Sequence, residues 1–359
     1  MPDKIPNASG AFGFFRAQVS NVSRLSPTFL RVTFTGQALR HFGNPQRTLD
    51  QRIKLVFPGP DGLPDLRQGS TFTDWKSLPD GKRGYMRTYS IRDLLVHPDG
   101  TTELTVDFAV HGSNPRGKRV NHVDPLSADV RGTDSHNTGL RSEELSDTGD
   151  SASGSGPGTE WAQAAAAGDE ALIYGPRRGR LDGGGIEFEP SDAKSIILIG
   201  DETAVPAATR ILQETAGDGA QITAFLEVPS GADALPVKLG ADQNLNWLVR
   251  GQGEVGSAVI PALLEHLGPD ESECDEACRP LTSDGLAPWE TAGYSNLEDL
   301  ARPQSAHVQA APGHDCYFWV AGESSMVTAL RRHLVKDLGV PRDAVAFMGY
   351  WRRGVAMRA

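Results

Sequence analysis

The sequence predicts an N-terminal antiparallel β-barrel followed by an α/β domain with a mostly parallel sheet. Three observations lead to this prediction. The chain has 359 residues, which suits two domains of roughly 100 to 200 residues each. Its first half contains short stretches of β-branched and aromatic residues without convincing helices between them, and its second half alternates strand and helix patterns. We expect the barrel domain over residues 12–180 and the α/β domain over residues 190–359.

Six short stretches in the first half have the composition of strands. From Arg31 to Phe34 polar and apolar residues alternate, the period of two that marks a strand with one buried face. The six stretches are FRAQVSNVSRL, FLRVTFTG, QRIKLVFPG, RTYSIR, ELTVDFAVH and EALIY. Short strands in this succession are typical of an antiparallel barrel or sandwich.

Residues 131–156 interrupt this pattern. Ser, Gly, Thr and Asp dominate the segment and no apolar period survives. Such a composition buries too little apolar surface to offset the entropy lost on ordering. We therefore expect a flexible insertion in the barrel domain.

The second half repeats a unit of strand, turn and helix. SIILI is followed by the turn GDET and a helical stretch, and CYFWV is followed by the turn AGESS and the helical MVTALRRHLVKDLG. ITAFLEV, LNWLV and AVAFMGYW supply further strands. Alternation of this kind predicts a mostly parallel sheet that binds ligands beyond the carboxyl ends of its strands. Residues 269–313, which are rich in acidic residues and proline, are expected to form an exposed loop outside the sheet.

Composition excludes several classes of protein. Lys+Arg 35 against Asp+Glu 46 gives 35 − 46 = −11, which argues against a nucleic-acid partner. Three cysteines cannot build a disulfide framework, and the chain has neither a signal-peptide pattern nor an apolar run of about 18 residues. We expect a cytoplasmic protein without membrane insertion. Cys274 and Cys278 have an uncommon spacing for zinc, so we expect no metal site.

The hexapeptide RTYSIR carries groups suited to a flavin nucleotide. The Arg87 guanidinium can bind a phosphate through two hydrogen bonds, and the Tyr89 ring can stack on a planar heterocycle. The hydroxyls of Thr88 and Ser90 can bond the edge of that heterocycle. The same hexapeptide would also serve as an ordinary barrel strand with solvated arginines.

Further motifs decide between these readings. RTYSIR resembles the R-x-Y-[ST] signature of the flavin-binding barrel in the ferredoxin reductase superfamily. It is followed in order by DFAVHG, GPGTEWA, GDETAVPA and GYWRRG. This succession resembles the siderophore-interacting proteins, which are FAD-dependent ferric-siderophore reductases, and it covers the chain from about residue 15 to residue 354 outside the two insertions. In that family GP-x-x-x-WA closely follows DF-x-x-HG, whereas here the first insertion separates the two motifs.

The resemblance implies an FAD site in the barrel domain. Trp351 is expected to pack near the flavin, and the start of the AQAAAA helix is expected beside the diphosphate. The implied FAD-binding residues are Arg87, Thr88, Tyr89, Ser90, Asp107, His111, Gly112, Trp161, Ala162 and Trp351.

The resemblance also implies an electron donor bound by the second domain. NADH or NADPH is expected at the two turns that follow parallel strands, and the acidic Asp201 and Glu202 would repel a 2′-phosphate and so favour NADH. A protein donor such as ferredoxin is the alternative. The expected NAD(P)H-binding residues are Gly200, Asp201, Glu202, Thr203, Gly322 and Glu323.

The acceptor implied is an anionic ferric siderophore, held by a basic triad near the flavin. Its expected members are Lys54, either Arg177 or Arg178, and either Arg352 or Arg353. No residue is expected to act as an acid or base, because the flavin carries the redox step. The alternatives are a flavin or ferredoxin reductase-like enzyme with another acceptor, and a siderophore-binding protein without turnover.

Overall fold

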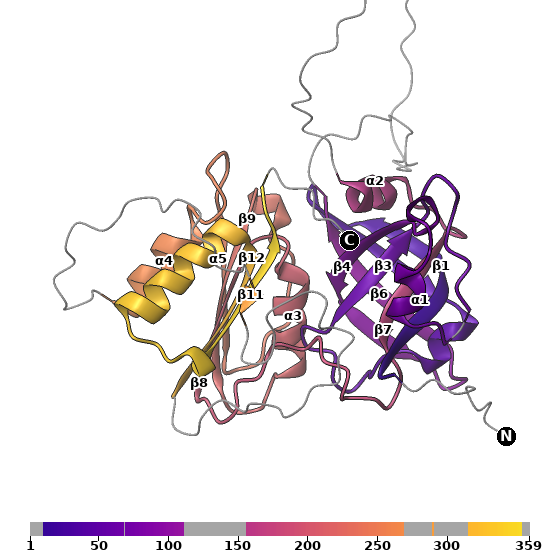
Figure 1. Cartoon of the computed structure of the whole chain (residues 1–359). Helices are drawn as coiled ribbons and strands as arrows, with labels where there is room; N and C mark the ends of the chain where they lie inside the picture. The colour runs from indigo at the N-terminus through magenta and orange to yellow at the C-terminus, as the bar shows by residue number, and fades with distance from the viewer. Residues whose placement is uncertain (1–9, 68, 111–155, 269–288, 291–314, 354–359) are drawn as a thin grey trace, which may run out of the picture.

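The computed structural model describes residues 10–67, 69–110, 156–268, 289–290 and 315–353. His111, Gly112 and nearly all of the two predicted insertions lie outside the described residues. Figure 1 shows two bodies, a curled sheet from the first half of the chain and a flatter sheet with helices from the second half. The predicted fold class is therefore confirmed.

The first sheet has seven strands in the order β4-β3-β7-β1-β2-β6-β5, and neighbouring strands are antiparallel. It curls until β4 at one edge approaches β6, where the rings of Tyr89 and Phe108 lie 4.5 Å apart. The predicted strands are present, and β5 is an additional one. The strands are β1 (Phe12–Arg24), β2 (Phe29–Thr35), β3 (Arg52–Phe57), β4 (Tyr85–Ser90), β5 (Asp93–Val96), β6 (Thr102–Ala109) and β7 (Glu170–Pro176).

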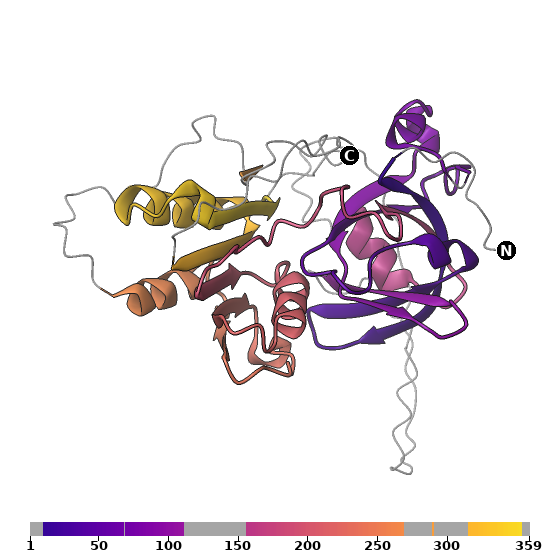
Figure 2. The same ribbon diagram turned by 90° about the horizontal axis from the view of Figure 1, so that it is seen from below.

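Two helices complete the barrel. The helix α2 (Pro157–Ala164) lies over one end of it, inside the ring of strands when seen along the barrel in Figure 2. Trp161 of α2 stacks on Phe57 with ring centroids 4.5 Å apart. The short helix α1 (Phe72–Lys76) covers part of the outer face of the sheet, where Phe72 packs on Tyr174 of β7. The barrel is thus closed at one end and partly covered on one side.

The second sheet has the strand order β10-β9-β8-β12-β13-β11. Its pairs are parallel except for β11 (Trp289–Glu290), which runs antiparallel to β13. We expected a loop outside the sheet at these two residues, which was wrong because they pair with the otherwise open edge of β13. The other strands are β8 (Ser195–Gly200), β9 (Gln221–Val228), β10 (Gln243–Val249), β12 (Cys316–Glu323) and β13 (Val345–Trp351).

Helices cover both faces of the parallel sheet. The helix α3 (Val205–Glu214) lies on the face toward the barrel, and α4 (Val259–Leu267) and α5 (Ser324–Arg331) lie on the other (Figure 1). A π-helical turn (Arg332–Asp337) continues α5. Met326, Leu330 and Leu334 of these two segments are buried, with exposed fractions of 2%, 1% and 0%.

The two sheets are joined by buried polar contacts. The carboxylate of Asp50, in the loop before β3, accepts hydrogen bonds from the Trp319 indole Nε1 of β12 (2.9 Å) and from the amides of Glu187 and Phe188 (3.1 and 3.2 Å). The connecting residues 177–194 therefore bond both to the barrel and, through Asp50, to the parallel sheet. Domain limits at residues 180 and 190 remain our proposal.

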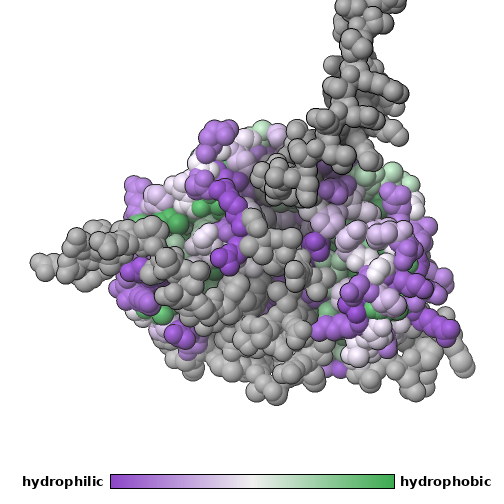
Figure 3. Space-filling view, turned by 45° about the horizontal axis from the view of Figure 1, so that its top comes forward, coloured by the Kyte–Doolittle hydropathy of each residue, from purple (hydrophilic) through white to green (hydrophobic). Residues whose placement is uncertain are grey.

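The described surface carries mixed polarity. In the view of Figure 3 hydrophilic residues are spread among small apolar patches. Within the described part of the chain, no helix is long and apolar enough to cross a membrane.

The buried Asp50 makes stability depend on pH. Burial raises the pKa of Asp50 to about 6, above its value of about 4 in an unfolded chain. The folded protein therefore holds this proton more tightly, and the contribution of Asp50 to the free energy of unfolding falls as the pH rises from about 4 to 6. We predict that the Asp50→Asn variant gains up to about 3 kcal/mol relative to the unsubstituted protein between pH 4 and 7.

Urea unfolding at a series of pH values measures this difference. Trp319→Phe removes a hydrogen bond that lowers the pKa of Asp50, so the transition in that variant should move to higher pH. A stability difference between Asp50→Asn and the unsubstituted protein that stays constant with pH would contradict the account.

Candidate functional site

A cavity of about 140 Å³ lies where the two sheets meet, at the seam of the barrel. Strands β4 and β6 form one wall, and the turn before α3 and the end of β13 form the other. Its lining residues are Arg52, Thr88, Tyr89, Ser90, Asp107, Ala109, Thr203, Pro206, Gly349 and Tyr350. The cavity thus brings together five predicted site residues, which are Thr88, Tyr89, Ser90, Asp107 and Thr203.

Strand β4 presents its hydroxyls beside two cations of β3. Thr88 stands opposite Lys54 and Ser90 opposite Arg52 in the antiparallel register, so these four side chains share one face of the sheet. Among the described strands β4 pairs with β3 alone, and the backbone groups on its other edge point toward the seam. A planar ligand with donors and acceptors along its edge suits this wall.

Tyr89 lies on the opposite face of β4, between the barrel interior and the cavity. Its ring lies 4.5 Å from that of Phe108 and 6.3 Å from that of Phe57. Burial raises the pKa of its phenol, so the hydroxyl stays protonated at neutral pH. Tyr89 therefore offers an aromatic surface and a hydrogen-bond donor, and no negative charge.

Asp107 is neutralised by arginines. Its carboxylate accepts two hydrogen bonds from Arg31, at 2.7 and 2.8 Å, and lies 3.7 Å from Arg92. Asp107 is only 5% exposed. Its carboxylate fixes the wall of the cavity and adds little net charge to it.

The start of α2 offers backbone amides near Arg87. Its N-cap, Gly156, makes no side-chain capping bond, and a Cβ on Gly158 would lie 3.4 Å from the Arg87 side chain. The Arg87 atom at this distance is Cγ, and its Nη1 donates to the Met86 carbonyl (2.7 Å). A helix start near an arginine suits an anion such as a diphosphate. The helix begins at Pro157 and ends at Ala164, so most of the alanine run expected to form it lies beyond its end.

Trp161 and Ala162 belong to the barrel core. Trp161 stacks between Phe57 and Phe34, at 4.5 and 6.0 Å, and Ala162 is 1% exposed. Their side chains hold α2 on the barrel end, and so position the amides at its start.

Asp201 and Glu202, at the end of β8, are fully buried. Asp201 accepts hydrogen bonds from the amide of Glu323 (2.7 Å) and from the indole of Trp351 (2.9 Å), and burial raises its pKa to about 6. Glu202 pairs with Arg250 at 2.6 and 2.7 Å. Since both carboxylates point inward, the preference for NADH that we derived from them does not follow. Trp351 packs on this turn and does not line the cavity.

Carboxylates of the chain cap two helices at this edge of the sheet. Glu323 accepts from the Ser325 and Met326 amides of α5 (2.6 and 3.2 Å), next to Gly322. Glu227 accepts from three amides at the start of α4, at 2.8 to 3.0 Å. By contrast α3 has no side-chain cap at Ala204. The Thr203 amide, just before α3, donates to the Asp201 carboxylate (2.8 Å), and Pro206 in the first turn has no amide hydrogen. Thr203 and Pro206 line the cavity.

The predicted basic triad is dispersed in the structure. Lys54 is 5% exposed, with Nζ 5.9 Å from the centroid of the Phe72 ring, and burial together with Arg52 and Lys76 lowers its pKa to about 8. The Arg177 Nε donates to the Gly10 carbonyl at 3.1 Å.

The other arginines of the predicted triad also bond elsewhere. Arg178 Nη2 donates to the Phe42 carbonyl at 2.8 Å. Arg352 and Arg353 are exposed, and Arg353 pairs with Glu254. None of the five predicted residues lines the cavity; these are Lys54, Arg177, Arg178, Arg352 and Arg353.

Sequence reasoning missed half of the cavity. Arg52 could have been found, because it lies two residues before Lys54 and so on the same strand face. The other missed residues depend on how the two sheets pack, which no local pattern records. They are Ala109, Pro206, Gly349 and Tyr350.

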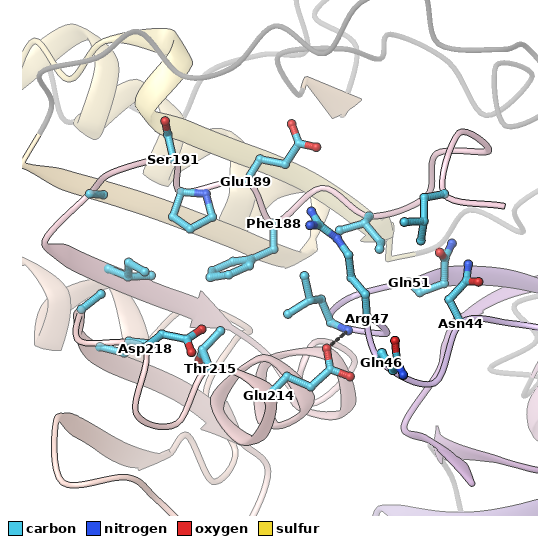
Figure 4. Close-up of a pocket in the computed structure, with 18 of the residues that line it drawn as sticks. Asn44, Gln46, Arg47, Gln51, Phe188, Glu189, Ser191, Glu214, Thr215 and Asp218 are labelled. Atoms are coloured by element: carbon cyan, nitrogen blue, oxygen red, sulfur yellow. Dashed lines mark hydrogen bonds between the residues drawn. The ribbon is translucent and has the colours of Figure 1, made fainter. Parts of the chain in front are cut away.

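A larger hollow of about 1010 Å³ lies beside the connecting segment. Figure 4 shows Glu214 and Asp218 from the second domain opposite Arg47 and Gln51 from the barrel, with Phe188 of the connecting segment between them. None of the predicted site residues lines it. Glu214 accepts from the amides of Thr48 and Leu49 (3.0 and 2.8 Å), which makes this hollow part of the interdomain contact.

The described residues hold no group of three or more His, Cys, Asp or Glu side chains that could bind a metal ion. Cys274 and Cys278 lie outside the described residues. Cys316, at the start of β12, is half-buried, and burial raises the pKa of its thiol.

Comparison with known proteins gives consistent matches. Residues 18–123 match the family profile "Siderophore-interacting FAD-binding domain", and residues 193–354 match "Siderophore-interacting protein". Ferric vibriobactin reductase ViuB of Vibrio cholerae is 25% identical over 337 residues, 92% of this chain and 86% of its own length.

Solved structures share the fold. A siderophore utilization protein from T. fusca superposes with a TM-score of 0.58 at 22% identity, covering 96% of this chain and 95% of its own. The siderophore-interacting protein SipS from Aeromonas hydrophila gives 0.55 at 22% identity, covering 96% and 94%.

The helix α2 approaches β4 closely at Gly158. A Cβ on Gly158 would lie 2.3 Å from the Tyr89 hydroxyl, whereas one on Gly156 would meet nothing within 4 Å. Gly158→Ala should therefore displace Tyr89 or lift α2, and lower the free energy of unfolding by about 1–3 kcal/mol. The matched Gly156→Ala should change it by less than about 1 kcal/mol. Urea unfolding of both variants checks this, and equal effects would contradict the described packing.

Proposed function

The chain belongs to the siderophore-interacting protein family, and from this we infer that it reduces ferric siderophores and releases Fe²⁺ from them. It is an FAD-dependent oxidoreductase. The observation that supports the assignment most is the seam cavity, where the hydroxyls and aromatic ring of RTYS meet the second sheet. The relative named ferric vibriobactin reductase supports the same reaction class.

The residues around the cavity fit a flavin nucleotide. Thr88 and Ser90 would bond the edge of the isoalloxazine ring, and Tyr89 would contact its face. Arg87 and the first amides of α2 would hold the diphosphate, since the close approach at Gly158 brings that helix start to Arg87. FAD, when bound, takes up two electrons and passes them on singly. The chain's own residues position the flavin and shield it from water.

Pyridine nucleotide is the donor we propose, with a protein donor such as ferredoxin as the alternative. Its nicotinamide would approach the cavity from the second sheet, near Thr203 and Gly200. The start of α3, which has no side-chain cap at Ala204, would face an anionic group there, whereas Glu227 and Glu323 already cap the starts of α4 and α5. Asp201 and Glu202 are buried, so they would act by shaping this turn.

Positive charge outside the cavity would draw the anionic ferric complex toward the flavin. Lys54, Arg177 and Arg178 lie on the barrel, and Arg352 and Arg353 on the end of β13. Charges act over several ångströms in a partly buried setting, so these residues need not line the cavity to contribute. Reduction releases the metal, because hard oxygen donors bind Fe²⁺ far more weakly than Fe³⁺.

Two other functions fit some of the same observations. A reductase with another acceptor would need the flavin site but no cations beside it. A siderophore-binding protein without turnover would need the cations but no flavin. Lys54 stands opposite Thr88 on β3, with Nζ 3.5 Å from the Thr88 hydroxyl of the cavity wall. A cation so near the cavity favours the ferric-siderophore reductase.

We predict that the purified protein binds FAD and reduces a ferric siderophore with NADH or NADPH. An anaerobic mixture of protein, nucleotide, ferric siderophore and a ferrous chelator should accumulate the Fe²⁺–chelator complex in proportion to nucleotide oxidised, two Fe²⁺ for each nucleotide. If reduced flavin forms but no Fe²⁺ appears, another acceptor is used. If the protein cannot be reconstituted with FAD, the remaining function is that of a siderophore-binding protein without turnover.

Lys54 should make siderophore capture depend on pH. The pKa of its amine is lowered to about 8, so its positive charge is present below this pH and is lost above it. The KM for an anionic ferric chelate should rise by about threefold to tenfold as the pH increases from 7 to 9.

Variants at Lys54 separate charge from packing. Lys54→Arg keeps its charge over this range and should flatten the rise, and the neutral Lys54→Met should show a high KM at both pH values. FAD should stay bound in both variants. A pH profile that is the same for Lys54→Met and the unsubstituted protein would exclude a role of this charge, and loss of FAD would show that Lys54 belongs to the flavin site.

A further inference from the structure

The cation that reaches the seam cavity is Arg52, which is not among the site residues predicted from the sequence. It is 4% exposed and stands directly opposite Ser90 in the β3–β4 ladder. Both residues line the cavity. Among the described residues of that lining, Arg52 carries the only positive charge.

A buried carboxylate fixes the Arg52 guanidinium. Its Nη2 donates to Glu187, and both side chains are 4% exposed. Glu187 is itself held at both ends of its peptide, because its amide donates to Asp50 (3.1 Å) and its carbonyl accepts from the Tyr317 hydroxyl (3.0 Å). The guanidinium therefore has a set position relative to the cavity.

Such a pair is a poor device for stability alone. Removing two charges from water costs several kcal/mol for each ion, and apolar residues of similar volume often stabilise a core as well or better. A buried pair placed against a cavity, however, fixes the electrostatic potential inside it, since the low local dielectric screens charges little. Because the Arg52–Glu187 pair lies against the cavity, we expect it to act on the ligand that the cavity binds.

Two other features of the cavity wall contribute positive charge or no net charge. The start of α3, with no side-chain cap, directs the positive end of a helix toward the cavity through Thr203 and Pro206. The carboxylate of Asp107 is neutralised by Arg31 and Arg92. The charged groups that act on Tyr350 of the cavity wall are Asp50, Arg52, Glu187 and Asp201. Of these four, Arg52 is the cation, and Glu187 is the carboxylate bonded directly to it.

We propose that Arg52 stabilises the negative charge that a flavin acquires on reduction, and that Glu187 limits this effect. The inference rests on the proposed function, because it takes the ligand of the seam cavity to be FAD. Uptake of two electrons and one proton leaves one net negative charge on the isoalloxazine ring. A fixed guanidinium beside that ring binds the reduced form more tightly than the oxidised form, and so raises the reduction potential. Glu187 is a positioning residue, which acts through Arg52.

The test measures the binding of FAD and its reduction potential in the reconstituted protein. Arg52→Gln should lower the ratio of affinities for reduced and oxidised FAD about tenfold, which for a two-electron couple is a fall of about 30 mV. Glu187→Gln should change the potential in the opposite direction, because the positive charge of Arg52 is then no longer offset. Arg52→Lys keeps the charge and should stay close to the unsubstituted protein.

Each variant is informative without the other, because Arg52→Gln and Glu187→Gln are expected to shift the potential in opposite directions. A merely structural pair would weaken the binding of both redox forms alike and leave the potential unchanged in Arg52→Gln and Glu187→Gln. That result, or a shift of the same sign in both variants, would overturn the proposal.

Failure of this inference can be told from failure of the proposed function. If the unsubstituted protein binds no FAD, the proposed function fails, and this inference fails with it. If FAD binds and Fe²⁺ is released but the potentials do not separate, the inference alone is overturned. If the potentials of Arg52→Gln and Glu187→Gln separate but no iron is released, the role of Arg52 is supported and only the proposed acceptor is wrong.

Discussion

The carboxylate of Asp50 is the interaction on which the arrangement of the molecule depends. It lies in the barrel, yet it accepts hydrogen bonds from Trp319 of the parallel sheet and from two amides of the connecting segment. Glu187, one of the two residues whose amides donate to Asp50, in turn binds Arg52 through its carboxylate. One buried anion thus fixes the approach of the two sheets and, one step further, the charge at the cavity between them.

Buried carboxylates serve the same purpose elsewhere in the second domain. Asp201 joins the ends of β8, β12 and β13, and Glu227 and Glu323 cap α4 and α5. Much of the acidic character at this edge is therefore internal and already hydrogen-bonded. The net charge of −11 consequently says little about which ligands the edge accepts.

Much of the fold, and half of the cavity, could be predicted from the sequence. Alternation along the strands placed Thr88 and Ser90 on one face of β4 and Tyr89 on the other, since side-chain direction follows from a period of two. The contributions of Pro206, Gly349 and Tyr350 could not be predicted, because they depend on the packing of two sheets from distant parts of the chain. The acids at the end of β8 were expected to meet a nucleotide, but charge alone does not reveal whether a carboxylate points inward to a partner such as Arg250.

We propose that FAD binds at the seam between β4, β6 and the second sheet. A crystal structure of the protein with bound FAD tests this most directly. We expect the isoalloxazine ring within hydrogen-bonding distance of Ser90 and beside Arg52, with the diphosphate at the start of α2. A flavin bound in the larger hollow beside the connecting segment, or one whose ring lies away from β4, would contradict it.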